Sequence, residues 1–196
     1  MLRITGGTWK GRALRSPSSQ KTRPSHARLR QALFNSIQFE IEGKHVLDLF
    51  AGSGALGFEA LSRGAMSVTF VESGRPALDC IRKNIQELQC ADRVKVKETD
   101  VDLALRHWTE SVTPPFHLIF SDPPYDLNWE QETFPCFSWD KLLTPHGKLI
   151  LEWGGRSGIL PDRLGTLVKV REKTYGDSVL TTFICQQDPI NESAKS

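Results

Sequence analysis

A regular alternation of strand patterns with helix patterns, beginning at His45, most constrains how this chain can fold. Residues 46–50 are apolar apart from Asp48, which predicts a buried strand, and residues 55–63 predict a helix that ends at Gly64. Further strands are predicted at residues 68–71, 94–96, 116–120 and 148–152, and further helices at residues 76–88, 101–108 and 134–143. Because strands that alternate with helices pair in parallel, the pattern predicts an α/β fold with helices on both faces of the sheet.

The last part of the chain departs from this alternation. Residues 167–173 and 179–185 are two β-like segments, and Tyr175-Gly176-Asp177 between them is a hairpin signal. We therefore expect a doubly wound, mostly parallel sheet of seven strands that ends in an antiparallel hairpin. Residues 41–187 would form this domain, and residues 188–196 a flexible tail.

Length and composition are those of one ordinary globular domain with a small appendage. The chain has 196 residues, of which 39% are hydrophobic and 24% are charged. No apolar run approaches the ~18 residues of a membrane span, and the scattered cysteines lack the CxxC spacing that would indicate zinc or a disulfide framework. We therefore expect a monomeric, cytoplasmic protein with no membrane association and no metal.

The net charge of +2 hides an uneven distribution. Residues 1–39 hold eight basic side chains and no acidic one, whereas the rest of the chain holds 23 acidic side chains against 17 basic ones. This pattern fits an anionic macromolecular partner, because Lys and Arg gain affinity by releasing phosphate counterions. A solvated, disordered tail is the alternative, but Trp9 and the Gly6-Gly7 turn favour an ordered element that faces nucleic acid.

We expect residues 1–40 to form a small basic extension. Two short strands are predicted at residues 2–5 and 12–14, followed by a polar linker at residues 16–25. Ser25 can cap a helix whose apolar face consists of Leu29, Ala32, Leu33 and Ile37. The basic residues expected to bind RNA are Lys10, Arg12, Arg23 and Arg28.

A glycine-rich loop follows the first strand of the predicted sheet. Gly52, Gly54 and Gly57 fit the pattern GxGxxG, and Glu72 lies 20 residues after Gly52 at the end of the next strand. Glycines allow a tight turn and a close approach to a ligand, and the carboxylate can accept hydrogen bonds from ribose hydroxyls. The loop fits either a nicotinamide dinucleotide or S-adenosylmethionine.

Two further carboxylates favour S-adenosylmethionine. Asp48 lies within the first strand, where its carboxylate could bind an amino group. A site for a pyrophosphate, which is negatively charged, does not need a carboxylate at this position. Asp100, at the end of the third strand, could accept a hydrogen bond from an adenine amine. Each residue also has a structural alternative, because Asp48 could accept backbone N–H groups and Asp100 could cap the next helix.

The sequence Asp122-Pro123-Pro124-Tyr125 follows the strand predicted at residues 116–120. Two prolines cannot continue a strand, so a carboxylate and an aromatic ring are held rigidly at its end. The exocyclic amine of a nucleobase could donate its two N–H groups to the Asp122 carboxylate and the Pro123 carbonyl, which would aim its lone pair at the methyl group of the cofactor. Tyr125 would stack on a base that is unpaired or flipped out of its helix. Asp122, Pro123 and Tyr125 are therefore the predicted catalytic residues.

These motifs resemble those of class I S-adenosylmethionine-dependent methyltransferases with a DPPY motif, and more closely those of bacterial small-subunit ribosomal RNA guanine-N2 methyltransferases. The resemblance rests on residues 3–12, 23–25, 28–35, 47–64, 122–125 and 175–177. It implies a Rossmann-like fold and methyl transfer from S-adenosylmethionine to the N2 amine of a guanine in 16S ribosomal RNA, within the small subunit or its assembly intermediate. It also implies a cofactor site formed by Asp48, Phe50, Gly52, Gly54, Glu72 and Asp100.

The chain departs from the pattern of that family at two positions. Ala27 replaces an acidic residue before Arg28, and Gly74 replaces an aspartate after the second strand, which leaves ribose binding to Glu72. The motifs alone leave an adenine-N6 methyltransferase of DNA or RNA open, because adenine presents an amine to the same two acceptors. A nicotinamide-dependent oxidoreductase and a non-catalytic RNA-binding assembly factor are the alternatives from other classes.

Overall fold

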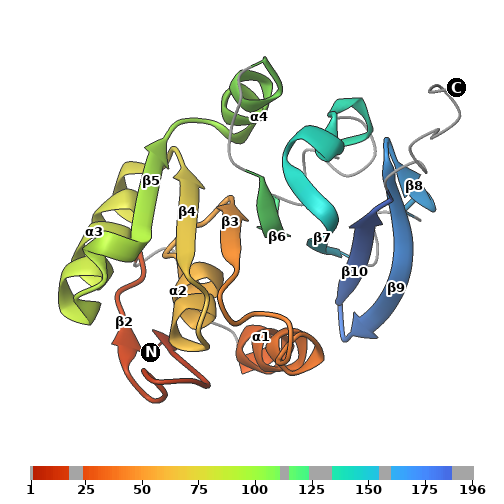
Figure 1. Cartoon of the computed structure of the whole chain (residues 1–196). Coiled ribbons are helices and arrows are strands. Elements are labelled where there is room, and N and C mark those ends of the chain that lie inside the picture. The colour runs from red at the N-terminus through yellow and green to blue at the C-terminus, as the bar shows by residue number, and fades with distance from the viewer. Residues whose placement is uncertain (1, 18–23, 111–114, 124–133, 155–159, 187–196) are drawn as a thin grey trace, which may run out of the picture.

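In the part of the chain that the structure describes, the central sheet has eight strands in the order β5-β4-β3-β6-β7-β10-β9-β8 (Figure 1). The computed structural model describes residues 2–17, 24–110, 115–123, 134–154 and 160–186. The strands of this sheet are β3 (His45–Leu49), β4 (Ser67–Glu72), β5 (Val94–Glu98), β6 (Phe116–Ser121), β7 (Leu143–Gly154), β8 (Arg163–Leu164), β9 (Leu167–Tyr175) and β10 (Ser178–Cys185). Neighbours from β5 to β7 pair in parallel, and β7, β10, β9 and β8 pair antiparallel. The mostly parallel sheet with a terminal hairpin is therefore confirmed.

The sheet has one strand more than the seven that the sequence predicts. The additional strand is β8, in which Arg163 and Leu164 pair with Val168 and Leu167 of β9. A strand of two residues is too short to show the alternation on which the prediction depends. The predicted count was therefore wrong by this edge strand.

Helices pack against both faces of the parallel half of the sheet. One hydrophobic cluster joins α1 (Pro24–Ser36), α2 (Ala55–Ser62) and α3 (Arg75–Leu88) to the sheet face that carries Val46 and Phe120. A second cluster joins α4 (Val101–Glu110) to the opposite face. Successive residues of a strand point to opposite faces, so the two clusters share the sheet between them.

The predicted helix at residues 134–143 is absent. The segment forms two 3₁₀ turns, η3 (Phe134–Cys136) and η4 (Trp139–Lys141), and β7 begins at Leu143, earlier than predicted. The buried indole N–H of Trp139 donates to the Phe134 carbonyl at 2.9 Å. That carbonyl would accept a backbone N–H four residues later in an α-helix. The buried position of Trp139 therefore favours the two 3₁₀ turns over the predicted α-helix.

The N-terminal extension packs on the first of these faces. Strands β1 (Leu2–Arg3) and β2 (Ala13–Leu14) form a separate two-stranded sheet, and Leu2, Ile4 and Leu14 belong to the same hydrophobic cluster as α2. Helix α1 begins at Pro24, so Ser25 is its second residue. The prediction that Ser25 caps this helix from the position before it was therefore wrong. The predicted apolar residues of this helix pack toward the sheet, with Leu29, Leu33 and Ile37 buried and Ala32 partly buried.

Candidate active site

The glycine loop turns the chain from β3 into α2 through three left-handed residues. Phe50, Gly52 and Gly54 have φ angles of 55°, 55° and 79°. Glycine adopts such angles without strain, whereas Phe50 is a strained exception at the strand end. Gly57 is required for a different reason, because a Cβ there would lie 2.2 Å from Cε1 of Phe70. The loop therefore brings the first turn of α2 tightly against the sheet.

Asp48 lies under this first turn. Its side chain is buried, and Oδ2 accepts the N–H of Gly57 at 2.9 Å. Burial raises the pKa of Asp48 to about 8, the Gly57 hydrogen bond opposes that rise, and the charge of Glu72 adds to it. The structural alternative considered for Asp48 is thus realised.

Glu72, at the end of β4, forms hydrogen bonds with the backbone of two turns. Its Oε2 accepts the N–H of Gly52 at 2.7 Å, and its Oε1 accepts the N–H groups of Ser73 at 3.0 Å and Gly74 at 2.7 Å. A Cβ at Gly74 would lie 3.0 Å from Oε1, so glycine at this position avoids crowding the carboxylate. Asp100 is exposed after β5, and its carbonyl accepts the N–H of Ala104 in the first turn of α4.

Asp122 and Pro123 follow β6 directly, at the same end of the sheet. Pro123 is buried, whereas Pro124 and Tyr125 lie outside the described residues. The pKa of Asp122 is raised well above that of an exposed carboxyl, first by burial and then by the negative charges of Glu152 and Asp48. Asp48, Asp122 and Glu152 therefore place three interacting carboxyl groups on the adjacent strands β3, β6 and β7 or directly after them.

Glu152 is a residue of this site that the sequence reasoning missed. It is 8% exposed on β7. It is the one charged residue in the apolar run 149–153, and that break in the run was a signal for a special role. Strand order changes direction between β3 and β6, which is where ligands bind in open α/β sheets.

The chain is similar to known proteins over most of its length. A family model described as "Conserved hypothetical protein 95" matches residues 2–184. The chain belongs to this family. Ribosomal RNA small subunit methyltransferase D of Escherichia coli is 37% identical over 175 residues, which cover 89% of this chain and 85% of that protein. The protein of the same name from Haemophilus influenzae is 33% identical over 177 residues and covers 89% of both chains.

A solved structure is similar over nearly the whole length of this family member. The protein yhhF of Escherichia coli, a candidate methyltransferase, has a TM-score of 0.81 and 29% identity, and the match covers 95% of this chain and 99% of that one. A candidate methylase from Haemophilus influenzae has a TM-score of 0.76, 28% identity and the same coverage. The fold is the Rossmann-like fold of class I methyltransferases.

The extension of this family member is anchored by a buried glutamate that sequence reasoning did not single out. Glu59 of α2 is fully buried and accepts hydrogen bonds from the N–H and Oγ1 of Thr5, both at 2.8 Å, and from Nε of Arg63 at 2.9 Å. Nε of Arg30 lies 3.5 Å from its other oxygen. Its one negative charge therefore joins α2 to α1 and to the segment after β1.

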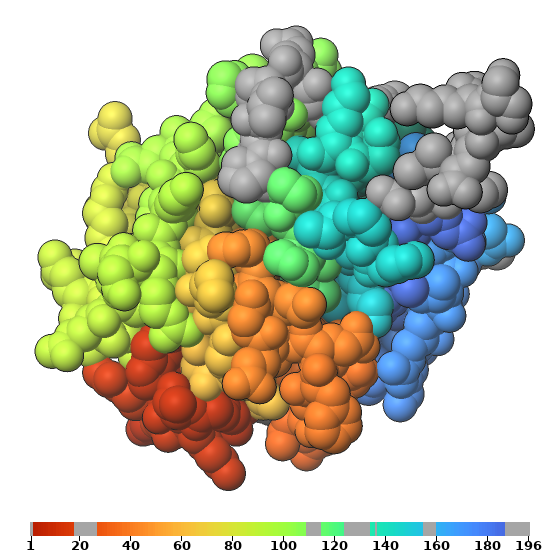
Figure 2. Space-filling view, in the orientation of Figure 1, coloured from red at the N-terminus to blue at the C-terminus, as the bar shows by residue number. Residues whose placement is uncertain are grey.

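A second anchor links the extension to the glycine loop. The buried Asn84 of α3 accepts the N–H of Arg15 at 2.7 Å and donates to the carbonyls of Arg15 and Ser53, both at 3.1 Å. Figure 2 shows the N-terminal segment, in red, next to the yellow-green α3 and the orange segment that contains α1. The extension is thus part of the support of the loop.

The basic residues of the extension fall into two sets. Arg3, Arg12, Arg15 and Arg30 each donate to a carbonyl or carboxylate within the molecule. Lys10 and Arg28 are exposed, and no ion pair is found for them in the part of the chain that the structure describes. Of the four predicted RNA-binding residues, Arg12 is therefore bound to the Glu87 carbonyl of α3, and Arg23 lies outside the described residues.

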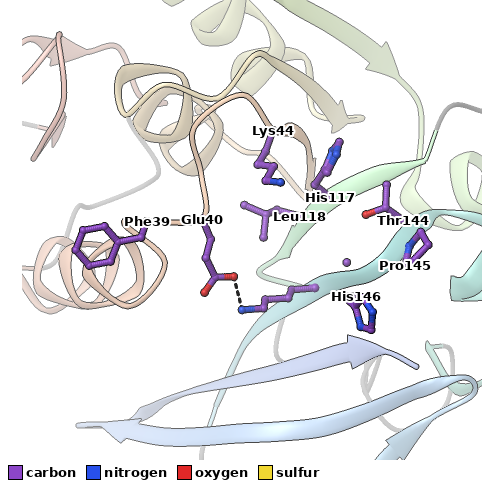
Figure 3. Close-up of a pocket in the computed structure, with 10 residues that line it drawn as sticks. Phe39, Glu40, Lys44, His117, Leu118, Thr144, Pro145 and His146 are labelled. Atoms are coloured by element: carbon purple, nitrogen blue, oxygen red, sulfur yellow. Dashed lines mark hydrogen bonds and ion pairs between the residues drawn. The ribbon is translucent and has the colours of Figure 1, made fainter. Parts of the chain in front are cut away.

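A pocket of about 300 Å³ opens at the other end of the sheet (Figure 3). Its walls include Lys44 before β3, His117 at the start of β6, and His146 and Lys148 near the start of β7. Lys148 forms an ion pair with Glu40. Burial and the nearby Lys44 lower the pKa of His117, and its Nδ1 accepts the backbone N–H of His45. This pocket is separate from the glycine loop and its carboxylates.

Two other kinds of feature are absent from the residues that the structure covers. No group of three or more His, Cys, Asp or Glu side chains there could hold a metal ion. No helix in those same ranges is long and apolar enough to cross a membrane.

Proposed function

We propose that this protein transfers a methyl group from S-adenosylmethionine to the exocyclic N2 amine of a guanine in 16S ribosomal RNA. The observation that carries the proposal is the position of Asp122 and Pro123 at the end of β6, beside the strand that leads into the glycine loop. An amine acceptor and a cofactor loop at one strand switch are what methyl transfer to a nucleobase requires.

The charges at this end of the sheet suit S-adenosylmethionine better than a nicotinamide dinucleotide. S-Adenosylmethionine carries a positive sulfonium and an amino group, which the carboxylates of Asp48 and Glu72 attract. A pyrophosphate needs free backbone N–H groups at the loop and the helix start. The N–H groups of Gly52 and Gly57 already donate to those two carboxylates. These contacts argue against the oxidoreductase alternative.

Asp122 has two tasks in the proposed reaction. The bound sulfonium supplies an electrophilic methyl group and leaves as a neutral thioether when the N–C bond forms. Asp122 and the Pro123 carbonyl accept the two N–H groups of the amine and so direct its lone pair. The raised pKa of Asp122 makes its carboxylate a stronger base than an exposed one, which suits it to take the proton that the amine loses.

The RNA part of the proposal is supported by the relatives and by the extension. Two relatives are named ribosomal RNA small subunit methyltransferase D. We infer that residues 1–40 act as an RNA-binding extension of a catalytic domain at residues 41–187, with the small subunit or its assembly intermediate as substrate. The protein would act as a cytoplasmic monomer, with Lys10, Arg28 and Arg23 contacting phosphates.

The proposal is tested with methyl-labelled cofactor and small ribosomal subunits from a strain that lacks this protein. We expect label in one guanine, mapped by mass spectrometry of the RNA. Asp122→Ala should lower turnover at least about 1,000-fold while cofactor affinity changes only a few-fold. Asp92→Ala, an exposed aspartate in the turn at Ala91–Arg93, is the control. Unchanged turnover of Asp122→Ala would refute the catalytic assignment, and label in an adenine would refute the base.

A salt titration tests the RNA contacts separately. Lys10→Glu and Arg28→Glu should each weaken RNA binding and reduce the slope of log affinity against log salt by about 1. Lys97→Glu, on the edge strand β5, is the matched control. Equal slopes for all three variants would show that the extension does not contact phosphates.

A further inference from the structure

Glu152 is a carboxylate that the proposed reaction does not yet use. It is 8% exposed, lies on β7 and stands between the apolar residues Leu151 and Trp153. A charged side chain in such a position loses most of its hydration, so a folded protein retains it where it meets a polar group. On the β10 side, its partner in register is Leu180, which is apolar.

One polar neighbour of Glu152, Asp122, lies on the β6 side. Ser121 of β6 pairs with Leu49 of β3 on one side and with Leu151 of β7 on the other. Asp122 is the residue after Ser121, and Glu152 is the residue after Leu151. Phe120 and Ile150, two residues earlier on the two strands, both belong to the cluster under α1 and α2. The two-residue repeat of β7 therefore turns Glu152 toward that face, and Asp122 directly follows Ser121, the neighbour of Leu151.

The electrostatics agree with this placement. The negative charge of Glu152 is the strongest influence on the pKa of Asp122 after burial, and it acts more strongly than Asp48. Two carboxyl groups that repel each other in a site partly shielded from water gain from a ligand with two adjacent donors. A nucleobase edge that carries an amine beside a ring N–H is such a ligand.

Guanine has this edge and adenine does not. In guanine the N2 amine stands beside the N1–H, so both positions donate hydrogen bonds. In adenine the N6 amine stands beside the N1 lone pair, which a carboxylate repels. We propose that Glu152 accepts the N1–H of the target guanine while Asp122 and the Pro123 carbonyl hold its N2 amine, so that Glu152 selects guanine over adenine.

This assignment rests on the proposed function. It adds a preference for guanine over adenine, which the DPPY motif alone does not determine. Glu152 acts as a positioning residue, because it holds the ring and not the reacting amine. A site built to accept a donor strongly rejects an analogue that presents a lone pair at the same position, because the lone pair and the carboxylate repel each other. A hydrogen bond to a charged acceptor contributes about 1.5–3 kcal/mol, which corresponds to about 10- to 150-fold in kcat/KM.

The test uses substrate RNA with either guanine or 2-aminopurine at the target position. 2-Aminopurine keeps the amine at C2 but has a lone pair in place of the N1–H. Wild-type protein should prefer guanine by at least about 10-fold in kcat/KM. Glu152→Gln should lower the ratio of kcat/KM for guanine to kcat/KM for 2-aminopurine by at least about 10-fold. The reason is that the Gln amide can donate to the N1 lone pair of 2-aminopurine. Glu172→Gln, on β9 of the same sheet, should keep the wild-type preference.

Each outcome separates the inference from the function on which it rests. An unchanged guanine preference in a folded Glu152→Gln protein that still binds the cofactor would overturn the role of Glu152. If that variant does not fold, Glu152→Asp keeps the charge and should lower kcat/KM for guanine while cofactor affinity is retained; equal kcat/KM would also overturn the role. Absence of transfer by the wild-type protein to guanine RNA would overturn the proposed function itself.

Discussion

The two ends of strands β3, β6 and β7 hold their polar side chains in opposite ways. At the carboxyl end, Asp48 and Glu72 are acidic and their oxygens accept backbone N–H groups at 2.7–3.0 Å. At the amino end, Lys44 and His146 line an open pocket, and Lys148 is paired with Glu40 (Figure 3). The carboxylates at the first end are fixed by directional hydrogen bonds, whereas the side chains at the second end face an open pocket or form an ion pair. Substitutions at the carboxyl end should therefore have the larger effects.

The largest effect on stability is expected at Gly57, in the first turn of α2. A Cβ there would lie 2.2 Å from Cε1 of Phe70 and 2.7 Å from Cγ1 of Val68. Gly57→Ala should therefore lower the free energy of unfolding by about 3 kcal/mol, measured by urea denaturation. Gly43→Ala at the amino end meets no atom within 4 Å and has only its φ of 70° to strain, so about 1 kcal/mol is expected. Equal losses would contradict the difference between the ends.

The second prediction concerns the pH dependence of stability through Asp48. Its folded-state pKa of about 8 lies above the ordinary value, so its contribution to stability is complete below about pH 4 and is lost as pH rises toward 8. Asp48→Asn stays neutral and keeps an oxygen for the N–H of Gly57. At pH 8 the variant should be more stable than the wild type, by at least several degrees in Tm, and the two proteins should converge near pH 4.

Above about pH 8, where Asp48 is ionised, the same substitution should weaken binding of the positively charged cofactor, because it removes a negative charge from the site. Asp92→Asn, in an exposed turn, is the control for both measurements. Tm curves of Asp48→Asn and wild type that run parallel from pH 4 to pH 8 would contradict the burial of an ionisable Asp48.

A smaller effect on stability is expected at Glu72. Glu72→Ala removes the acceptor of three backbone N–H groups, but the side chain is half-buried and water can replace part of what is lost. The free energy of unfolding should fall by about 1–2 kcal/mol, and cofactor affinity by at least about 10-fold. Glu98→Ala, at the end of the neighbouring β5, should leave cofactor affinity unchanged. A calorimetric titration with S-adenosylmethionine decides between these outcomes.

The smallest effect belongs to the ion pair at the amino end. Lys148 and Glu40 are 20% and 46% exposed, so water and salt screen their attraction. A double-mutant cycle with Lys148→Gln and Glu40→Gln should give a coupling energy of no more than about 1 kcal/mol, falling with added salt. A coupling of about 3 kcal/mol would mean that the amino end is as dehydrated as the carboxyl end.

Much of the fold could be predicted because local patterns carry it. The strand–loop–helix unit at β3 and α2, and the terminal hairpin, follow from apolar periodicity and glycine positions, and both are confirmed. The helix expected at residues 134–143 was wrong because burial of Trp139 outweighs local periodicity. The roles of Asp48, Glu72 and Asp122 stay predictions that the geometry supports, and Tyr125 lies outside the described residues.

The charged extension shows the limit of composition as a guide. Its excess of basic residues indicated an RNA-facing surface, yet Arg12 and Arg30 bind acceptors inside the molecule. Composition gives the number of charged side chains but not which of them form hydrogen bonds or ion pairs within the folded protein. Glu59 and Asn84, the partners that dock the extension, lie more than 50 residues from Thr5 and Arg15, which they bind.

The sequence by itself determined the units of this protein: a glycine loop after a buried strand, a carboxylate before two prolines, and an alternation that allows only a parallel sheet. These units depend on backbone angles and periodicity over a few residues. Only the tertiary structure decided that Asp122 and Glu152 stand side by side. That placement depends on β6 and β7 being neighbours in register, which packing across the whole sheet decides and no local pattern contains.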